Sequence, residues 1–286
     1  MEKYSILVNS CDSYQDIWPY FFEILNRTWR GEKPTIFLNT ESMKCDFKDT
    51  EVITLNLIPG KNKDTPWGER LLDCLSRINT DYVLMMLEDF LFEEPIKTEI
   101  ISDCIESMEL NHSIAAYQFI HASEGYEASQ EKNICKGFSK RKTHGHFKIV
   151  AGPSLWRKKD LMLLTLKSDS PWGWEYFGNY RTYFCGKSFY GIDDPELNVF
   201  VYDIKHGGAI HRGKWVGYKM AELQKKYDIQ IDYGDREVEW DWMQMPQYSE
   251  VAPVFKRIRT ITSNKINTLK NLTLGLYIRK KLKSAR

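Results

Sequence analysis

The sequence predicts an α/β fold, in which helices flank a mostly parallel central sheet and a basic helical tail follows. Short β-branched and apolar runs alternate with longer stretches of helical periodicity, which is typical of such folds. The run Tyr82–Leu87 is apolar throughout, as expected of a parallel strand covered on both faces. No Asp or Glu follows Glu250, whereas Lys and Arg recur to the end. We therefore expect one α/β domain over residues 1–250 and a tail over residues 251–286.

The first half of the domain is predicted to alternate strands with helices. Apolar residues recur at helical spacing from Ile17 to Trp29 and from Leu71 to Ile78. The expected elements are strand Tyr4–Val8, helix Asp16–Trp29, strands Thr35–Leu38 and Glu51–Leu57, helix Pro66–Ile78 and strand Tyr82–Leu87. This order favours a sheet of parallel strands with helical crossovers.

The second half is less regular. We expect helix Ile96–Met108, strand Ile114–Phe119, a strand, turn and helix within Ile149–Leu166, and a last strand at Val199–Ile204. The stretch from His121 to His146 is polar and is predicted to be a loop. The segment Pro171–Tyr180 is rich in aromatic residues and glycine.

Composition excludes several classes of protein. A net charge of +1 argues against a general nucleic-acid binder. The six cysteines are scattered without a C-x-x-C pair, which favours reduced thiols over a zinc site or a disulfide framework. Neither a signal peptide nor a membrane-spanning apolar run is visible, so we expect a cytoplasmic protein. Nine tryptophans weakly favour carbohydrate binding, because flat rings cover the apolar faces of sugars.

The acidic pair Glu88-Asp89 directly follows the apolar run Tyr82–Leu87. Ligands of parallel α/β sheets bind beyond the carboxyl ends of the strands, where the polar segments Asn9–Asp12 and Asn39–Glu41 are also expected. Carboxylates there suit a hard cation such as Mn²⁺ or Mg²⁺, which retains substrate phosphate oxygens as ligands. The alternative is an acidic pair that opens a loop or caps the next helix.

Three segments taken in order carry a family resemblance: Ile6–Asp12, Trp67–Leu71 and Thr80–Asp89. Together they resemble bacterial glycosyltransferases with the GT-A fold, a Rossmann-like α/β fold, and in particular those encoded in capsule and cell-surface polysaccharide loci. The resemblance covers about residues 4–215. In that family an acidic motif after the fourth strand, often Asp-x-Asp, holds the metal and the donor diphosphate. It implies Asp89 as metal ligand and Glu88 as a helper, with Leu87 in place of the first Asp.

The same resemblance implies where the nucleotide lies. Asn9, Ser10 and Asp12, after the first strand, are candidates for holding the nucleobase and ribose. Arg70, on the helix before the acidic pair, is a candidate for the donor phosphate or sugar. The alternatives are ordinary turn chemistry for the first three residues and an exposed helical arginine for the fourth.

A carboxylate between aromatic residues is the candidate catalytic base. Glu175 lies in the segment Ser170–Tyr176, with Trp172 and Trp174 beside it. Apolar surroundings raise the pKa of a carboxyl group and make its carboxylate a stronger base. The family resemblance implies a helix here beneath the acceptor, with both tryptophans, and Trp156 from a preceding turn, in contact with sugar. The alternative is a core aromatic patch whose glutamate caps a helix.

The segment His206–Trp215 is the last candidate part of the functional site. Many GT-A enzymes supply a final metal ligand from a histidine after the last strand, which implies His211, with His206 as competitor. Arg212 and Lys214 would then neutralise the leaving diphosphate. The two histidines His144 and His146 are an alternative metal site, but we interpret them as part of a loop.

The expected function is therefore transfer of a hexosyl or related sugar from a UDP-sugar to a saccharide or lipid-linked saccharide, with inversion. Retention stays open, and the donor base rests on the resemblance alone. Two rival interpretations are a metal-dependent phosphotransferase or hydrolase that uses the same acids, and a non-catalytic sugar-binding protein with this fold.

The basic tail suggests a location. From Val254 to Arg286, apolar and basic residues recur at spacings of three and four, which predicts one or two amphipathic helices. Such helices lie on anionic membrane surfaces, so the protein is expected to bind peripherally at the inner face of the cell membrane. The alternative is a basic helix packed on an acidic body, or a solvated tail.

Overall fold

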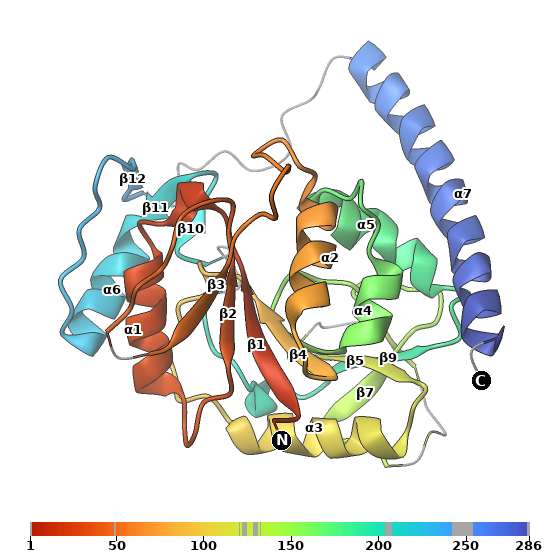
Figure 1. The fold of residues 1–286 in the computed structure, drawn as a ribbon, viewed down its shortest axis with the longest axis horizontal. Helices are drawn as coiled ribbons and strands as arrows, with labels where there is room; N and C mark the ends of the chain where they lie inside the picture. Colours follow the sequence, from red (N-terminus) through yellow and green to blue (C-terminus); the bar gives the residue numbers. More distant parts are fainter. Residues whose placement is uncertain are drawn as a thin grey trace.

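A nine-stranded sheet with helices on both faces forms the centre of the molecule (Figure 1). The computed structural model describes residues 2–48, 50–119, 121, 125–127, 131, 133–203, 208–241 and 254–284. A second sheet of three short strands lies beside the main sheet. The α/β class and the C-terminal helix are confirmed. The predicted domain boundary at residue 250 falls outside the described residues.

The expected elements of the first half are all present, and their bounds differ from the prediction by no more than a few residues. They are β1 (Tyr4–Asn9), η1 (Asp12–Tyr14), α1 (Trp18–Thr28), β2 (Ile36–Asn39), β3 (Val52–Leu55), α2 (Trp67–Arg77) and β4 (Tyr82–Met86). The 3-10 helix η1 is the one addition, between β1 and α1. Periodicity was sufficient here because each element buries one continuous apolar face or run.

The second half departs from the prediction at several points. Its elements are α3 (Thr98–Leu110), β5 (Ile114–Gln118), β6 (Tyr126–Glu127), β7 (Phe138–Arg141), β8 (Ser154–Arg157), α4 (Lys158–Leu164), α5 (Pro171–Thr182), β9 (Ser188–Ile192), η2 (Pro195–Leu197), β10 (Ile210–His211), β11 (Lys214–Val216), α6 (Gly217–Tyr227), β12 (Val238–Glu239) and α7 (Val254–Ser284). The predicted loop 121–146 thus contains two strands.

The predicted last strand, Val199–Ile204, is wrong. Residues 199–203 form no strand in the structure, and residue 204 lies outside the described part. Their backbone instead accepts hydrogen bonds from Glu93 and Lys97, at 2.7 and 3.4 Å. Among the strands that the prediction missed is β9, a short buried run between turns.

The sheet is mixed, so the expectation of a mostly parallel sheet holds only in part. Its strand order is β3-β2-β1-β4-β8-β5-β9-β7-β6. The first four strands pair in parallel, as do β5 and β9. Strand β8 runs antiparallel to both β4 and β5, and β7 runs antiparallel to both β9 and β6. Because β8 is reversed, its first residues lie at the edge where β4 and β5 end.

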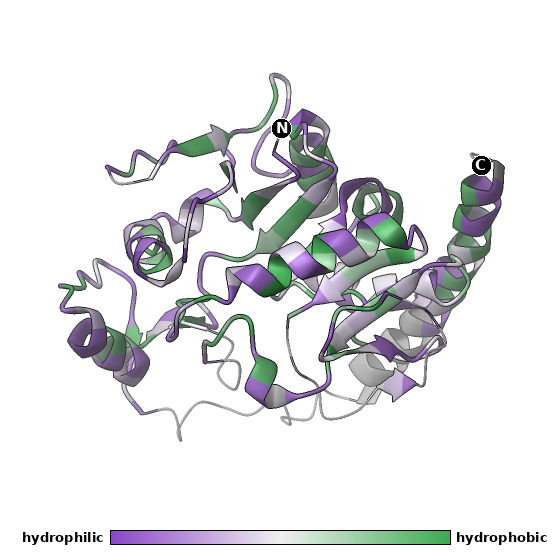
Figure 2. Ribbon diagram, turned by 90° about the horizontal axis from the view of Figure 1, so that it is seen from below, coloured by the Kyte–Doolittle hydropathy of each residue, from purple (hydrophilic) through white to green (hydrophobic). Residues whose placement is uncertain are grey.

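Helices cover both faces of the sheet. Successive side chains of a strand point to opposite faces, so Ile6 and Val8 of β1 join a core with α1 and α3, whereas Leu7 joins a core with α2, α4 and α5. Figure 2 shows that α3, nearest to the viewer, carries both hydrophobic and hydrophilic residues, as a helix with one buried face does. Two cores explain why the central strands are apolar without a break.

The long helix α7 lies at the outer edge of the molecule and packs on α5 (Figure 1). Among the described helices, none has both the length and the apolar character that crossing a bilayer requires.

Candidate functional site

The carboxyl ends of β1, β2 and β4 meet at one edge of the sheet. Asn9, the last residue of β1, pairs with Asn39, the last residue of β2, and Val8 pairs with Met86 at the end of β4. Glu88 follows two residues after Met86. The polar strand ends that the sequence predicted therefore gather at one edge.

Asn9 and Ser10 lie in the interior of this edge. Both are buried, and the Asn9 side-chain oxygen accepts a hydrogen bond of 2.6 Å from the amide of Asn39. The Asn9 amide nitrogen has no hydrogen-bond partner among the described residues. The hydroxyl group of Ser10 accepts a hydrogen bond of 2.7 Å from the Trp18 indole and donates one of 3.4 Å to the Cys11 carbonyl oxygen.

Asp12 holds a neighbouring loop in place. Its carboxylate accepts hydrogen bonds of 3.1 Å from the backbone N–H groups of Glu41, Ser42 and Met43, and one of 2.6 Å from the Ser42 hydroxyl. Burial acts to raise the pKa of Asp12, but these hydrogen bonds outweigh it and lower the pKa. The carboxylate is thus engaged by the protein itself, and the contact of Asp12 with a nucleotide stays a prediction.

Arg70 reaches the same edge from α2. Its guanidinium group forms an ion pair with Glu41, whose other carboxylate oxygen accepts a hydrogen bond from the backbone N–H of Asp12. The Arg70 Nε atom is buried and has no partner among the described residues. Arg70 is therefore a largely buried cation at the strand ends, and the interpretation as an exposed helical arginine is wrong.

Glu88 and Asp89 form a turn at the end of β4. Glu88 is 5% exposed, and its pKa is raised from the ordinary 4.5, first by burial and then by the charge of Asp89. Burial also raises the pKa of Asp89 from the ordinary 3.8. The Asp89 Oδ1 atom is buried without a hydrogen-bond partner among the described residues. Local hydrogen bonds and the charge of Arg236 offset this burial only in part, since both pKa values are raised, and burial of two adjacent carboxylates is costly.

The backbone after residue 207 lies directly against Asp89. The N–H group of Ala209 donates a hydrogen bond of 2.8 Å to the Asp89 carbonyl oxygen. Gly208 has a φ of 104°, and a Cβ atom there would lie 2.5 Å from that oxygen and 3.3 Å from the Asp89 carboxyl carbon. Only glycine fits this close approach. His206, the predicted competitor of His211, lies outside the described residues.

A hairpin of β10 and β11 carries the three predicted polar residues of this segment. His211 pairs with Lys214, and Arg212 and Gly213 form the two-residue turn between them. Both turn residues have positive φ, 50° and 81°, as a type I′ turn requires. Lys214 forms an ion pair of 2.6 Å with Glu237.

Arg236 was missed by the sequence analysis, and no motif marks it. It donates bidentate hydrogen bonds of 2.6 and 2.7 Å to Asp16 and further bonds of 2.7 Å to the Ser13 carbonyl and 3.1 Å to the Gly213 carbonyl. Its charge also acts on Glu88. It thereby ties the hairpin turn to the segment after β1. A shallow pocket of about 510 Å³ lies here, lined by Ser13, Arg212, Gly213, Lys214, Asp235, Arg236 and Glu237.

Glu175 comes to the same region through the reversed strand β8. Its carboxylate accepts a hydrogen bond of 2.5 Å from the backbone N–H of Ala151, just before β8. Helix α5 begins as its sequence dictates, since the Ser170 hydroxyl accepts a hydrogen bond from Gly173 and Pro171 occupies the first turn. Burial raises the pKa of Glu175, although the Ala151 hydrogen bond opposes this.

Tyr202, which the prediction placed in a strand, is affected by the charges of both Asp89 and Glu175. It is 8% exposed and its ring lies on Phe90 with centroids 4.5 Å apart. Burial raises the pKa of Tyr202, and the charges of both Asp89 and Glu175 raise it further. Both charges act on one phenol, so Asp89 and Glu175 each lie within electrostatic reach of Tyr202.

The predicted aromatic contacts separate into two groups. Trp156 and Trp174 are fully buried and pack on each other in the core, with centroids 6.0 Å apart. Neither ring has a free face for a sugar, so their predicted acceptor contacts are wrong for this structure. Trp172 is 74% exposed, and Tyr176, one helical turn later, is 51% exposed. These two rings are available to a ligand.

The donor set at Glu88 and Asp89 fits a hard divalent cation. Mg²⁺ is usually held by one or two protein carboxylates, with water and substrate phosphates completing its shell. The unpartnered Asp89 oxygen supplies such a ligand. The described residues contain no group of three or more His, Cys, Asp or Glu side chains suited to a metal, so His211 does not join the pair in one. A metal site made of Asp89 and His211 alone would be smaller than such a group, so the role of His211 as a metal ligand stays a prediction.

Comparison with known proteins identifies no family, because no family model and no curated protein matches the chain. Solved structures with some similarity include S. aureus TarS residues 1–349, at 12% identity and a TM-score of 0.40 over 68% of this chain. A second is CMP:2-keto-3-deoxy-manno-octonic acid synthetase complexed with CTP, at 11% identity and a TM-score of 0.42, covering 79% of this chain and 97% of that one. A third is glucosyl-3-phosphoglycerate synthase from Mycobacterium tuberculosis, at 12% identity and a TM-score of 0.39, covering 80% of this chain and 81% of that one. The chain spans 61% of the TarS fragment and 35% of a longer TarS structure. These similarities are too low to support an argument about function.

Proposed function

We propose that the chain is a glycosyltransferase that moves a sugar from a nucleotide-diphosphate sugar, such as a UDP-sugar, to a hydroxyl group of a saccharide or lipid-linked saccharide in cell-surface polysaccharide synthesis. The observation that carries the proposal is the buried Glu88-Asp89 pair at the strand ends, with an unpartnered Asp89 oxygen and with Glu175 within electrostatic reach of the same tyrosine, Tyr202. In this proposal the acidic pair would hold the donor through a cation, and Glu175 would serve as the base.

The donor diphosphate would bind at Glu88 and Asp89 together with Mn²⁺ or Mg²⁺. The cation would neutralise the two carboxylates and the charge that develops on the leaving diphosphate. Asn9 and Ser10 would contact the nucleoside from the end of β1, with Asp12 holding the neighbouring loop. The unpartnered nitrogens of Asn9 and Arg70 are donors that a ligand at this edge can use.

Glu175 would act as the base. In an inverting transfer, the acceptor hydroxyl oxygen forms a bond to the anomeric carbon while the bond from that carbon to the diphosphate breaks. The Glu175 carboxylate takes the hydroxyl proton, and the diphosphate leaves with the electron pair. Burial supports this role, because a carboxylate of raised pKa holds a proton better.

The flanking residues complete the proposed site. Arg212 and Lys214 would stabilise the departing nucleotide diphosphate from the hairpin. Trp172 and Tyr176 are exposed on the helix that carries Glu175, and their rings would cover the apolar face of an acceptor sugar.

The test is incubation of the protein with UDP-sugars, Mn²⁺ and a panel of saccharide acceptors. We expect release of UDP and a glycosylated product, detected by mass spectrometry. Asp89→Asn and Glu175→Gln should each lower the rate by about a hundredfold or more. The matched control is Glu99→Gln, at an exposed carboxylate on α3, which should leave the rate unchanged.

The rival functions predict different outcomes. Phosphate release without a glycosylated product would replace the proposal with a phosphotransferase or hydrolase. Saccharide binding without turnover in the parent protein, unchanged in Asp89→Asn and Glu175→Gln, would indicate a non-catalytic binding protein.

A further inference from the structure

Helix α7 is fixed to the body of the protein through one face. Asn271 and Ile278 are 5% and 2% exposed. The Asn271 side-chain oxygen accepts a hydrogen bond from Arg181 of α5, which is itself held by a bidentate ion pair of 2.6 Å with Asp169. At Gly275 the two helices approach so closely that a Cβ atom would lie 2.5 Å from the Arg181 carbonyl oxygen. Of the two alternatives in the sequence analysis, the solvated tail is therefore wrong over this part of α7, because the helix packs on the body of the protein.

The opposite face of α7 carries large apolar side chains in solvent. Its four members, Ile266, Leu269, Leu276 and Tyr277, are 63%, 67%, 54% and 62% exposed. At about 100° per residue they fall within a sector about 100° wide, directly opposite the buried face. We call these four residues the apolar stripe. Soluble surfaces rarely keep such a contiguous apolar set without a binding role.

Basic residues surround the apolar stripe. The exposed cations of the described helix are Lys265, Lys270, Arg279, Lys280, Lys281 and Lys283. No Asp or Glu occurs in α7. Lys280 lies within the sector of the stripe, and the others lie at its edges or just beyond. The outward face thus carries four apolar side chains with Lys280 among them and further cations beside them, and α7 has no acidic residue.

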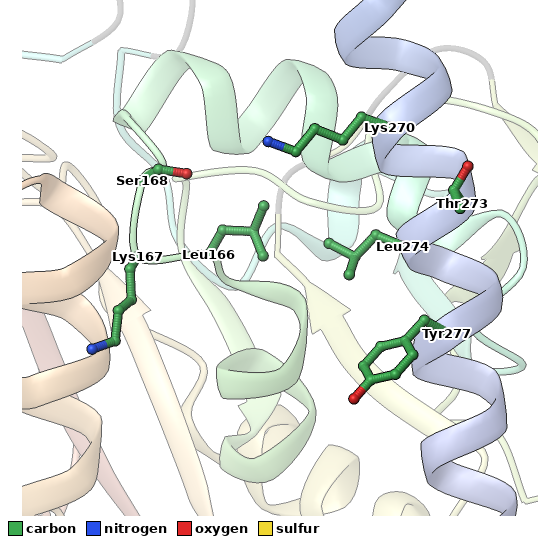
Figure 3. Close-up of a pocket in the computed structure, with 7 residues that line it drawn as sticks. All are labelled: Leu166, Lys167, Ser168, Lys270, Thr273, Leu274 and Tyr277. Carbon is green, nitrogen blue, oxygen red and sulfur yellow. The ribbon is translucent and has the colours of Figure 1, made fainter.

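A groove widens this face on one side. It has a volume of about 490 Å³ and lies between α7 and residues 166–168. Figure 3 shows Leu166 and Leu274 facing one another across it, with Lys270 and Tyr277 on the helix side. The groove therefore continues the apolar stripe through Tyr277.

We propose that the outward face of α7 binds an anionic phospholipid surface, with the apolar stripe in the interfacial region and the surrounding lysines at the headgroups. An interfacial helix has this composition, an apolar face flanked by Lys and Arg. The charge argues against a second copy of this chain as occupant, because two such faces would bring two sets of cations together without acids between them. This proposal does not depend on glycosyl transfer.

The experiment is cosedimentation of the full-length protein with vesicles of phosphatidylcholine alone or mixed with phosphatidylglycerol. We expect binding to the mixed vesicles, weaker binding to the neutral ones, and a decrease as salt is added. The double substitution Leu269→Gln with Leu276→Gln should weaken partitioning by about tenfold or more, because two apolar side chains no longer enter the interface. Lys280→Gln with Lys283→Gln should reduce the preference for phosphatidylglycerol.

Leu110→Gln is the matched control. Leu110 is 69% exposed, but it lies at the end of α3 and is not part of the apolar stripe on α7. This variant should bind vesicles as the parent does, and all variants should keep the parent's thermal unfolding midpoint since the positions are exposed. Failure of the parent to bind anionic vesicles, or equal binding by the Leu269/Leu276 variant, overturns the proposal. A concentration-dependent dimer that this variant abolishes, without vesicle binding, would assign the face to self-association.

Discussion

At the scale of single residues, the candidate site depends on groups whose polar atoms the protein itself leaves unsatisfied. The Asp89 oxygen, the Asn9 amide and the Arg70 Nε atom all face the strand ends without partners among the described residues. Buried polar groups normally find partners. Their concentration at one edge therefore supports a ligand there, whereas Asp12 is already satisfied by backbone N–H groups.

Gly208 is the residue whose replacement tests the local packing most directly. We expect Gly208→Ala to lower the free energy of unfolding by about 2–4 kcal/mol, because the new methyl group adds a clash with the Asp89 carbonyl to the strain of positive φ. Chemical denaturation measures this loss. The proposed transferase activity should decline as well, since residue 208 touches Asp89.

The control for this variant is Gly234→Ala. Gly234 also has a positive φ, 53°, but a Cβ atom there would meet nothing within 4 Å. Gly234→Ala should therefore lower the free energy of unfolding only through backbone strain, by about 1–2 kcal/mol. Equal losses in the two variants would mean that the contact with Asp89 contributes nothing.

At the scale of elements, the reversed strand β8 and the joint between α5 and α7 decide the arrangement. Strand β8 brings Ala151 to the edge where β4 ends, and Ala151 holds Glu175. Arg181 of α5 bonds Asp169, the Leu164 carbonyl and Asn271, and so connects α7 to the rest of the layer. A buried arginine with this many partners is costly to disturb.

The joint is tested at Gly275. Alanine normally stabilises a helix relative to glycine, by up to about 1 kcal/mol. We expect Gly275→Ala to lower the free energy of unfolding instead, by about 1–3 kcal/mol, because its Cβ atom would lie 2.5 Å from the Arg181 carbonyl oxygen. Denaturant titration measures whether the free energy of unfolding falls or rises. The control is Thr273→Ala, on the exposed face of the same helix, which should leave the free energy of unfolding unchanged or raise it. If Gly275→Ala also raises the free energy of unfolding, α5 and α7 do not pack closely.

At the scale of the whole molecule, the buried acidic pair lowers the stability of the fold at neutral pH. The pKa values of Glu88 and Asp89 are raised in the folded protein, chiefly by burial. Between the ordinary values, near 4, and the raised ones, the folded state binds more protons than the unfolded state. The free energy of unfolding therefore falls as the pH rises through this window. This is a cost that a bound cation would remove.

Neutral isosteres should remove the same cost. We expect the double variant Glu88→Gln with Asp89→Asn to have a free energy of unfolding about 1–3 kcal/mol above the parent at pH 8, with the difference vanishing as the pH falls below the ordinary pKa values. Thermal and denaturant unfolding at several pH values measure it. Glu51→Gln, at an exposed carboxylate, is the control and should follow the parent throughout. A double variant less stable than the parent at pH 8 would contradict the burial cost.

Hydrophobic periodicity determined the first half of this fold from the sequence. Every strand and helix from β1 to β4 was predicted, because parallel strands buried on both faces and amphipathic helices have distinct local patterns. The same patterns placed Asn9, Ser10 and the acidic pair at one edge. They could not distinguish β9 from a loop, nor the extended segment 199–203 from a strand, because short apolar runs look alike in either state.

Tertiary structure alone decided which polar and aromatic residues are available. Nothing local distinguishes buried Trp174 from exposed Trp172, two positions earlier on α5, because the difference arises from packing against Trp156 of strand β8. Tyr202 and Arg236 carry no motif, yet the fold brings Tyr202 within electrostatic reach of Asp89 and Glu175, and Arg236 within electrostatic reach of Glu88. The sequence by itself determined the elements and the acids at the strand ends. The pairing order of distant strands decided the rest, since burial and charge depend on neighbours far away in the chain.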